Sequence, residues 1–264
     1  MELGLQGRRA LVTGSTAGIG FAIAAGLAAE GARVTITGRT GETVERALHR
    51  LRDHAPGCQV AGIAADCASA EGARSVFEQV PDTDILVNNL GIYERRAVFE
   101  ISDADWLRMF ETNVMSGARF TAHYAPAMAR QGWGRVLFVS SESALNIPRD
   151  MVHYGMSKTA QLSLSRGYAM ELAGTGVTVN ALLPGPTHTE NTDRLRAERA
   201  KAAGKTVEEV EQDFLRVLRP TSLLKRFTSA DEVASLAVYL CSERASATTG
   251  AAMRVDGGVV NQIM

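Results

Sequence analysis

The fold is decided by the stretch Thr13-Gly14-Ser15-Thr16-Ala17-Gly18-Ile19-Gly20, which follows a short apolar run and opens a helical pattern. Glycines let the chain turn tightly and let backbone N–H groups approach a pyrophosphate, while the helix N-terminus adds unpaired donors and a partial positive charge. The spacing is G-x-x-x-G-x-G and not the common G-x-G-x-x-G, and such a cluster can also be a strand-to-helix turn without a ligand. Because it follows an N-terminal strand, we predict a dinucleotide site at Gly14, Ser15, Thr16, Gly18, Ile19 and Gly20.

Outward from this turn, short apolar runs alternate with longer helical patterns, which is typical of βαβ units around a parallel sheet. Several runs are almost continuously apolar, as strands buried on both faces are. The expected strands are Ala10–Thr13, Arg33–Thr37, Gln59–Ala64, Ile85–Asn88, Val136–Ser140, Val177–Leu182 and Ala252–Val255. The expected helices are Ile19–Glu30, Glu42–His54, Ala70–Gln79, Asp103–Arg130, Met151–Ala173 and Ala230–Ser242. With no repeat, low-complexity stretch or linker, we predict one doubly wound α/β domain over residues 1–264, with a parallel sheet of about seven strands.

The composition excludes several classes of function. The 264 residues are 45% hydrophobic and 22% charged with a net charge of −1, so nothing favours nucleic acid or an anionic membrane as a partner. The three cysteines, Cys58, Cys67 and Cys241, are too dispersed for a metal-binding pair, and we expect reduced thiols and no metal site. No apolar stretch reaches the length of a signal peptide or a transmembrane helix, so we expect a cytoplasmic protein with no membrane partner.

The segment 186–220 breaks the alternation, because it contains no strand and many charged residues. Long insertions in compact domains are usually lids or disordered loops. Val207, Val210, Phe214 and Leu218 recur at helical spacing, so we predict a mobile helical lid with its apolar face toward the site. The alternative is a solvated surface helix with no role in binding.

The end of the second expected strand, Thr37-Gly38-Arg39-Thr40, bears on the choice of coenzyme. A carboxylate here would hold the adenosine ribose hydroxyls and favour NAD, whereas a base would bind the 2′-phosphate of NADP. Gly38 offers no carboxylate, and Arg39 offers a guanidinium, which binds phosphate well. We therefore predict NADP, with NAD as the alternative because Ala17 places no second base in the glycine turn.

A second motif, Tyr154-Gly155-Met156-Ser157-Lys158, starts a helix and puts Tyr154 and Lys158 on one helix face. Lowering a tyrosine pKa by about 3 units takes roughly 4 kcal/mol, and an ammonium about 4 Å away supplies ~4 kcal/mol at an effective dielectric of about 20. Lys158 is therefore expected to make Tyr154 a working acid and base. Ser141 directly follows the fifth expected strand. Ligands bind at the carboxyl ends of parallel strands, so we expect its hydroxyl to reach the same substrate oxygen.

These motifs resemble those of the short-chain dehydrogenase/reductase family, and the resemblance covers nearly the whole chain. The family's TGxxxGIG turn, its NNAG motif with Leu90 in place of alanine, its serine with YxxxK, and its PGxxxT stretch occur here in the family's order. The matching positions are Thr13–Gly20, Asp66, Asn88–Gly91, Asn113, Ser141, Tyr154, Lys158, Pro184–Thr189 and Val255–Gly258. The resemblance implies a Rossmann-like fold and an NAD(P)-dependent oxidoreductase similar to the 3-oxoacyl-carrier-protein reductase branch.

The resemblance also implies a role for each matching residue. Tyr154 exchanges a proton with the substrate oxygen, Lys158 lowers the pKa of Tyr154 and holds the nicotinamide ribose, and Ser141 polarises the carbonyl. Asn113 steadies a water that links Lys158 to solvent. The expected coenzyme contacts are Gly14, Ser15, Thr16, Gly18, Ile19, Gly20, Arg39, Asp66, Asn89, Tyr154, Lys158, Pro184, Gly185, Thr187 and Thr189.

Residues beside these motifs are expected to shape the substrate pocket together with the lid. They are Leu90, Tyr93, Glu94, Glu142, Ser143, Asn146, Ile147 and Met151. For Glu142, a carboxylate that faces solvent explains the sequence equally well. Since members of the family habitually form tetramers through two long helices, the resemblance implies a homotetramer through Asp103–Arg130 and Met151–Ala173.

The leading hypothesis is an NADP-preferring reductase or dehydrogenase that acts on a small carbonyl or secondary alcohol substrate. One alternative is an NAD-dependent alcohol or sugar dehydrogenase of the same family. Another is a dinucleotide-binding regulator without catalysis, although such a protein would not need Asn113, Ser141, Tyr154 and Lys158 together. Family members with non-redox chemistry usually lose the glycine turn, which this chain keeps.

Overall fold

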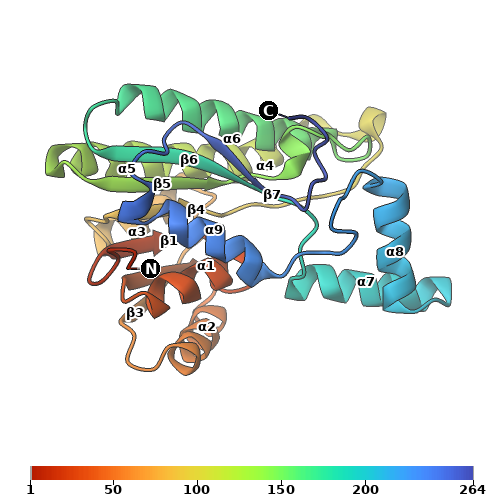
Figure 1. The fold of residues 1–264 in the computed structure, drawn as a ribbon, viewed down its shortest axis with the longest axis horizontal. Helices are drawn as coiled ribbons and strands as arrows, with labels where there is room; N and C mark the ends of the chain where they lie inside the picture. The colour runs from red at the N-terminus through yellow and green to blue at the C-terminus, as the bar shows by residue number, and fades with distance from the viewer. Residues whose placement is uncertain (1, 264) are drawn as a thin grey trace.

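A parallel sheet forms the centre of the protein, whose computed structural model describes residues 2–263. The strands are β1 (Arg9–Val12), β2 (Arg33–Gly38), β3 (Val60–Ala64), β4 (Ile85–Asn88), β5 (Gly134–Val139), β6 (Val177–Pro184) and β7 (Ala252–Val255). They lie in the order β3-β2-β1-β4-β5-β6-β7, and every neighbouring pair is parallel (Figure 1). The order reverses between β1 and β4, where doubly wound sheets form a ligand crevice. The predicted fold class is thus confirmed.

Helices cover both faces of this sheet (Figure 1). They are α1 (Gly18–Ala29), α2 (Gly41–His54), α3 (Ala70–Gln79), α4 (Asp103–Phe110), α5 (Ser116–Gln131), α6 (Val152–Glu171) and α9 (Ala230–Leu240). Helices α1, α2 and α9 enclose one apolar cluster that includes Leu27 and Leu51, while α3, α5 and α6 enclose a second that includes Phe120 and Phe138. Within residues 2–263, none of the helices has the length and apolar character needed to cross a membrane.

The long helix expected over Asp103–Arg130 is interrupted. A capping box starts α4, in which the Ser102 side chain accepts from the backbone N–H of Asp105 and the Asp105 carboxylate accepts from that of Ser102. The chain then passes through a π-helical turn, η2 (Glu111–Met115), before α5 begins. Such turns occur often at functional sites, and this one carries the buried Asn113.

The segment 186–220 forms two helices, α7 (Glu190–Ala203) and α8 (Val207–Leu218), which stand clear of the sheet (Figure 1). Gly204 separates them with a left-handed backbone, which ends α7. The predicted helical character is confirmed, but the predicted apolar face is only partly buried. Leu215 is 3% exposed, whereas Val207 and Leu218 are 37% and 39% exposed.

Candidate active site

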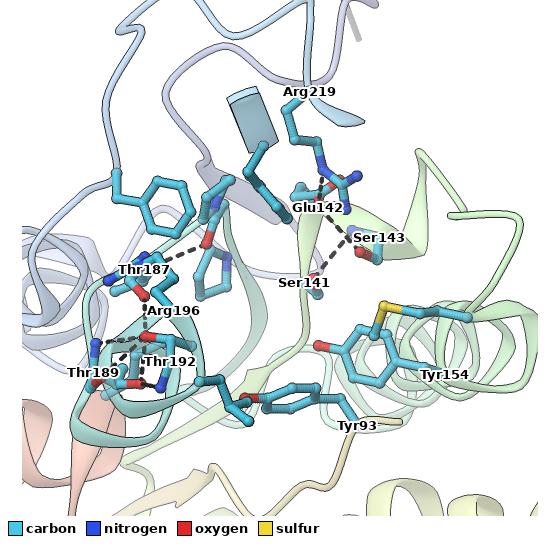
Figure 2. A pocket seen from close by; sticks show the side chains of 18 of the residues that line it. Tyr93, Ser141, Glu142, Ser143, Tyr154, Thr187, Thr189, Thr192, Arg196 and Arg219 are labelled. Atoms are coloured by element: carbon cyan, nitrogen blue, oxygen red, sulfur yellow. Dashed lines mark hydrogen bonds and ion pairs between the residues drawn. The ribbon is translucent and has the colours of Figure 1, made fainter. Parts of the chain in front are cut away.

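The expected motifs meet at the carboxyl edge of the sheet, around a cavity of about 290 Å³. Tyr154 and Ser141 lie on one side of this cavity, and Thr187, Thr189 and Arg196 lie on the other (Figure 2). The lining is Ile19, Tyr93, Arg95, Ser140, Ser141, Glu142, Ser143, Met151, Tyr154, Pro184, Gly185, Pro186, Thr187, Thr189, Thr192, Leu195, Arg196, Arg199, Phe214, Arg219 and Phe227. The lid therefore supplies one wall. Of the pocket residues expected from the sequence, Leu90, Glu94, Asn146 and Ile147 are not part of this lining.

The glycine turn is held in shape by its neighbours. Gly18 has a φ of 58°, which is strained for residues with a side chain. Asn89 donates from its amide to the carbonyls of Thr13 and Gly14 at 3.0 and 2.9 Å. A Cβ on Gly20 would lie 2.3 Å from that amide nitrogen, so only glycine fits there. The Asn89 side chain thus stabilises the conformation of the glycine turn.

Ser15 is buried at the base of the glycine turn. Its hydroxyl is fully buried, donates to the Val12 carbonyl at 2.6 Å and accepts from the Thr37 N–H at 3.2 Å. The Ser15 N–H also donates to the Thr37 carbonyl. These contacts brace the turn against β2, and the expected contact of Ser15 with a coenzyme stays a prediction.

The Glu190 side-chain carboxylate binds the glycine turn. The Gly18 N–H, at the start of α1, donates to Glu190 Oε2 at 2.8 Å, and Arg50 donates to the other carboxylate oxygen at 3.1 Å. Burial opposes the charge of Glu190, but the N–H donors of Glu190 and Gly18 and the Arg50 guanidinium hold its pKa below the usual range. The carboxylate shows that the turn accepts negative charge, as a dinucleotide pyrophosphate requires.

A second cavity, of about 170 Å³, adjoins the turn where an adenosine would lie. Thr16, Gly38, Arg39 and Asp66 line it, and the Arg39 and Asp66 side chains are exposed at its rim. Leu90 lines this second cavity and not the cavity beside Tyr154, where the sequence predicts it. The residues present therefore fit a bound dinucleotide.

Tyr154 lies in the first turn of α6, and its hydroxyl points toward Ser141 (Figure 2). Burial raises the pKa of Tyr154 to about 12, although the neighbouring Ser141 hydroxyl acts in the opposite direction. Ser141 itself accepts from the Ser143 N–H at 3.1 Å, which fixes its side chain. The protein's own groups therefore keep Tyr154 protonated near neutral pH.

The Lys158 ammonium lies near the Tyr154 ring and is held by two oxygen acceptors. The ammonium lies 5.7 Å from the centre of the Tyr154 ring and donates to the Val139 carbonyl at 2.9 Å and to Gln161 Oε1 at 3.3 Å. Burial lowers the pKa of Lys158 to about 7, so the amine is only partly charged at neutral pH. A helix spacing predicts which face residues share, but it does not predict the desolvation of the charge.

Asn113 is brought next to this lysine by the π-helical turn. Its side-chain amide donates to the Ile92 carbonyl and to the Ser157 hydroxyl, both at 2.9 Å, and its oxygen accepts from the Ile92 N–H at 2.7 Å. These contacts tie η2 to α6 and to the chain after β4. Asn113 reaches Lys158 through the side chain of Gln161, which the sequence reasoning did not single out.

The loop after β6, which the sequence predicts to hold the nicotinamide, lines the cavity. Thr187 is 6% exposed, and its hydroxyl contacts the Gly185 carbonyl at 2.8 Å and the Thr228 hydroxyl at 3.1 Å. Thr189 caps α7 by accepting from the Thr192 N–H at 3.3 Å. Pro184 and Gly185 line the cavity together with Thr187 and Thr189, so the residues of the expected PGxxxT stretch share one cavity.

Glu142 is buried, contrary to the alternative of a carboxylate that faces solvent. It is 3% exposed and pairs with Arg219 at 2.7 Å, at the end of α8 (Figure 2). Burial raises the pKa of Glu142, while the Arg219 charge and hydrogen bond act against this rise. The sequence could not reveal this pair, because Arg219 belongs to a segment whose many charges are typical of a solvated surface.

The chain is similar to known oxidoreductases over its whole length. The family model described as enoyl-(acyl carrier protein) reductase matches residues 14–260. The oxidoreductase YvaG of Bacillus subtilis is 43% identical over 100% of both chains, and 3-oxoacyl-[acyl-carrier-protein] reductase FabG of Aquifex aeolicus is 34% identical over 98% of this chain and 100% of its own. The solved structure of L-sorbose reductase from Gluconobacter frateurii, complexed with NADPH and L-sorbose, has a TM-score of 0.93 at 31% identity and covers 100% of both chains.

Proposed function

The chain belongs to the short-chain dehydrogenase/reductase family, and on this premise we propose that Tyr154 is the acid and base of an NADP(H)-preferring oxidoreductase. The protein is an NAD(P)-dependent enzyme that interconverts a carbonyl and an alcohol. The observation that carries the proposal for the site is the convergence of Tyr154 and Ser141 on one cavity beside the glycine turn.

Tyr154, Ser141 and Lys158 have different roles in the reaction at the substrate oxygen. The nicotinamide, when bound, supplies or accepts the hydride. Tyr154, protonated because of its raised pKa, suits delivery of a proton to a carbonyl oxygen. Ser141 hydrogen-bonds the same oxygen and polarises the carbonyl. Lys158, charged, lowers the pKa of Tyr154 so that the phenol can also accept a proton from an alcohol.

The coenzyme preference rests on the adenosine end of the site. Gly38 provides no carboxylate there, and Arg39 stands exposed at the rim. The L-sorbose reductase, similar over the whole chain, is complexed with NADPH. Titration of the protein with NADPH and with NADH distinguishes this preference from the NAD-dependent alternative.

The substrate class is a small carbonyl compound or secondary alcohol. Its cavity lies between Tyr154 and the lid, and the similar proteins act on substrates as different as a 3-oxoacyl group and L-sorbose. A screen of ketones and alcohols, followed by the absorbance of NADPH, tests the proposal. Absence of turnover with every compound, together with tight coenzyme binding, would instead support a regulator without catalysis.

We extend the proposal to assembly and location. Leu107 on α4 is 68% exposed and Met170 on α6 is 67% exposed, which suits the predicted homotetramer through these helices. Cys58, Cys67 and Cys241 are free thiols, which suits a cytoplasmic location. The mass in solution at micromolar concentration tests the assembly, and a monomer would contradict it.

A further inference from the structure

We propose that Gln161 is a positioning residue for Lys158, which keeps the ammonium charged and joins it to the π-helical turn. This inference rests on the proposed function, because it concerns the lysine that serves Tyr154. Gln161 lies one turn after Lys158 on α6, so the motif reads Tyr-x-x-x-Lys-x-x-Gln. It extends the catalytic helix face by one residue.

Both ends of the Gln161 carboxamide are engaged. Its oxygen accepts from the Lys158 ammonium at 3.3 Å, and its nitrogen donates to the backbone carbonyl of Asn113 at 2.6 Å. The side chain is 1% exposed, and glutamine is seldom so deeply buried. A buried amide requires partners for its donor and its acceptor, and here the partners are the lysine and the carbonyl of η2.

The π-helical turn explains how Gln161 finds a backbone carbonyl. Where a helix widens into such a turn, a side chain from a neighbouring element can insert among its carbonyls. Asn113 lies in η2, and its side chain is already committed to Ile92 and Ser157. Gln161 therefore connects Lys158 to the backbone carbonyl of Asn113, while the Asn113 side chain binds elsewhere.

The surroundings of Lys158 make this contact important for charge. The groups that face it are the Tyr154 phenol on α6, the Val139 carbonyl on β5, the Asn113 carboxamide on η2 and Gly91 after β4. None of these is a carboxylate, and burial lowers the pKa of Lys158 to about 7. The oxygen of Gln161 is thus one of two acceptors that favour the charged amine, and its removal should lower the pKa further.

The direct test is a titration of Lys158 by NMR. The chain contains four lysines, Lys158, Lys201, Lys205 and Lys225, so a protein with ¹³C-labelled lysine gives a spectrum that Lys158→Met assigns. Gln161→Met keeps a similar volume but removes the acceptor, and we expect the pKa of Lys158 to fall by about one unit. Gln161→Glu keeps an acceptor oxygen and adds a charge, so we expect the pKa to rise.

Gln131→Met is the matched control, because Gln131 ends α5 and is exposed. It should leave the titration of Lys158 unchanged. Unchanged signals of Lys201, Lys205 and Lys225 would show that a Gln161 variant is folded. The proposal is overturned if Lys158 titrates at the same pH in the unmodified protein, in Gln161→Met and in Gln161→Glu. If Gln161→Met does not fold, Gln161→Glu decides by the same criterion.

A rate profile separates charge from mere packing. With a pKa about one unit lower, the charged fraction of Lys158 falls about tenfold at pH 8 but only about twofold at pH 6. The deficit in kcat of Gln161→Met should therefore shrink as the pH falls, whereas a structural defect would be uniform. The NMR titration needs neither coenzyme nor substrate, so a failure of the proposed function would remove the rate profile and leave the titration intact.

Discussion

The two ends of the active-site cavity are built in different ways. The coenzyme end is made mostly by residues close in sequence, from Thr13 to Gly20, with Asn89 as a brace. The lid end is held by contacts between distant residues, since Glu142 and Arg219 are 77 positions apart and Gly18 and Glu190 are 172 apart. Local motifs therefore predict the coenzyme end, whereas the other wall of the cavity depends on how the segment 186–220 packs.

Tyr154→Phe should distinguish catalysis from coenzyme binding most clearly, because it removes the proton donor and leaves the glycine turn unchanged. We expect kcat to fall by about 10²-fold or more, the scale of general acid–base catalysis, with coenzyme affinity nearly unchanged. Steady-state kinetics and a coenzyme titration measure the two effects. Tyr239→Phe, on the exposed side of α9, is the control. Near-normal turnover in Tyr154→Phe would refute the assignment.

The buried ion pair at the lid end should matter for stability. Arg219→Met leaves Glu142 buried without its partner, so we expect the free energy of unfolding to fall by about 3–5 kcal/mol. A double variant with Glu142→Met should recover much of this loss, because no unpaired charge remains buried. Arg194→Met is the control, since Arg194 and Glu198 pair with both side chains exposed and contribute about 1 kcal/mol or less. Equal unfolding curves for Arg219→Met and Arg194→Met would contradict the prediction.

Arg39→Leu changes only the coenzyme end. Loss of a charge-assisted hydrogen bond to the 2′-phosphate should weaken NADP binding by about tenfold or more and leave NAD binding unchanged. Introducing an acid by Gly38→Asp is less informative, because a Cβ there would lie 2.4 Å from Thr16 Cγ2. Arg33→Leu, at the other end of β2, is the control. Tighter binding of NAD than of NADP by the unmodified protein would reverse the coenzyme assignment.

Glu190→Gln changes the contact between α7 and the glycine turn, where the two ends of the cavity meet. The Glu190 carboxylate lies on the N–H that a pyrophosphate would use, so its neutralisation should tighten coenzyme binding by about two- to fivefold. The depressed pKa of Glu190 means that its contact stabilises the fold at neutral pH and loses this contribution as the pH falls through that pKa. Glu198→Gln, on the same helix, is the control. Weaker coenzyme binding in Glu190→Gln would mean that the carboxylate assists the ligand.

The smallest expected effect is a change in the order of the lid. Helix α8 has little buried surface, and we expect its amides to exchange faster than those of the sheet. Coenzyme and substrate together should slow this exchange, because a closed lid excludes water from the site. Hydrogen exchange over residues 206–218 measures it. Strong and equal protection with and without ligands would show a fixed surface helix.

The sequence predicts Tyr154, Ser141 and Lys158 as site residues, but it does not predict the surroundings of the Lys158 charge. Spacing on a helix predicts proximity, and the cavity brings Tyr154 and Ser141 together as expected. The charge on Lys158 could not be predicted, because it depends on burial and on the Val139 and Gln161 oxygens. The burial of Ser15 against β2 could not be predicted for a similar reason, since it is a property of the packed sheet.

The parallel sheet, the glycine turn and the order of the motifs follow from the sequence alone. Hydrophobic periodicity and glycine conformation act over a few residues, so they can be recognised without the fold. The burial of Glu142 with Arg219, the seat of Glu190 on the turn and the link from Lys158 through Gln161 to Asn113 required the tertiary structure. Each depends on desolvation or on contacts between separate elements, and neither can be calculated before the chain is folded.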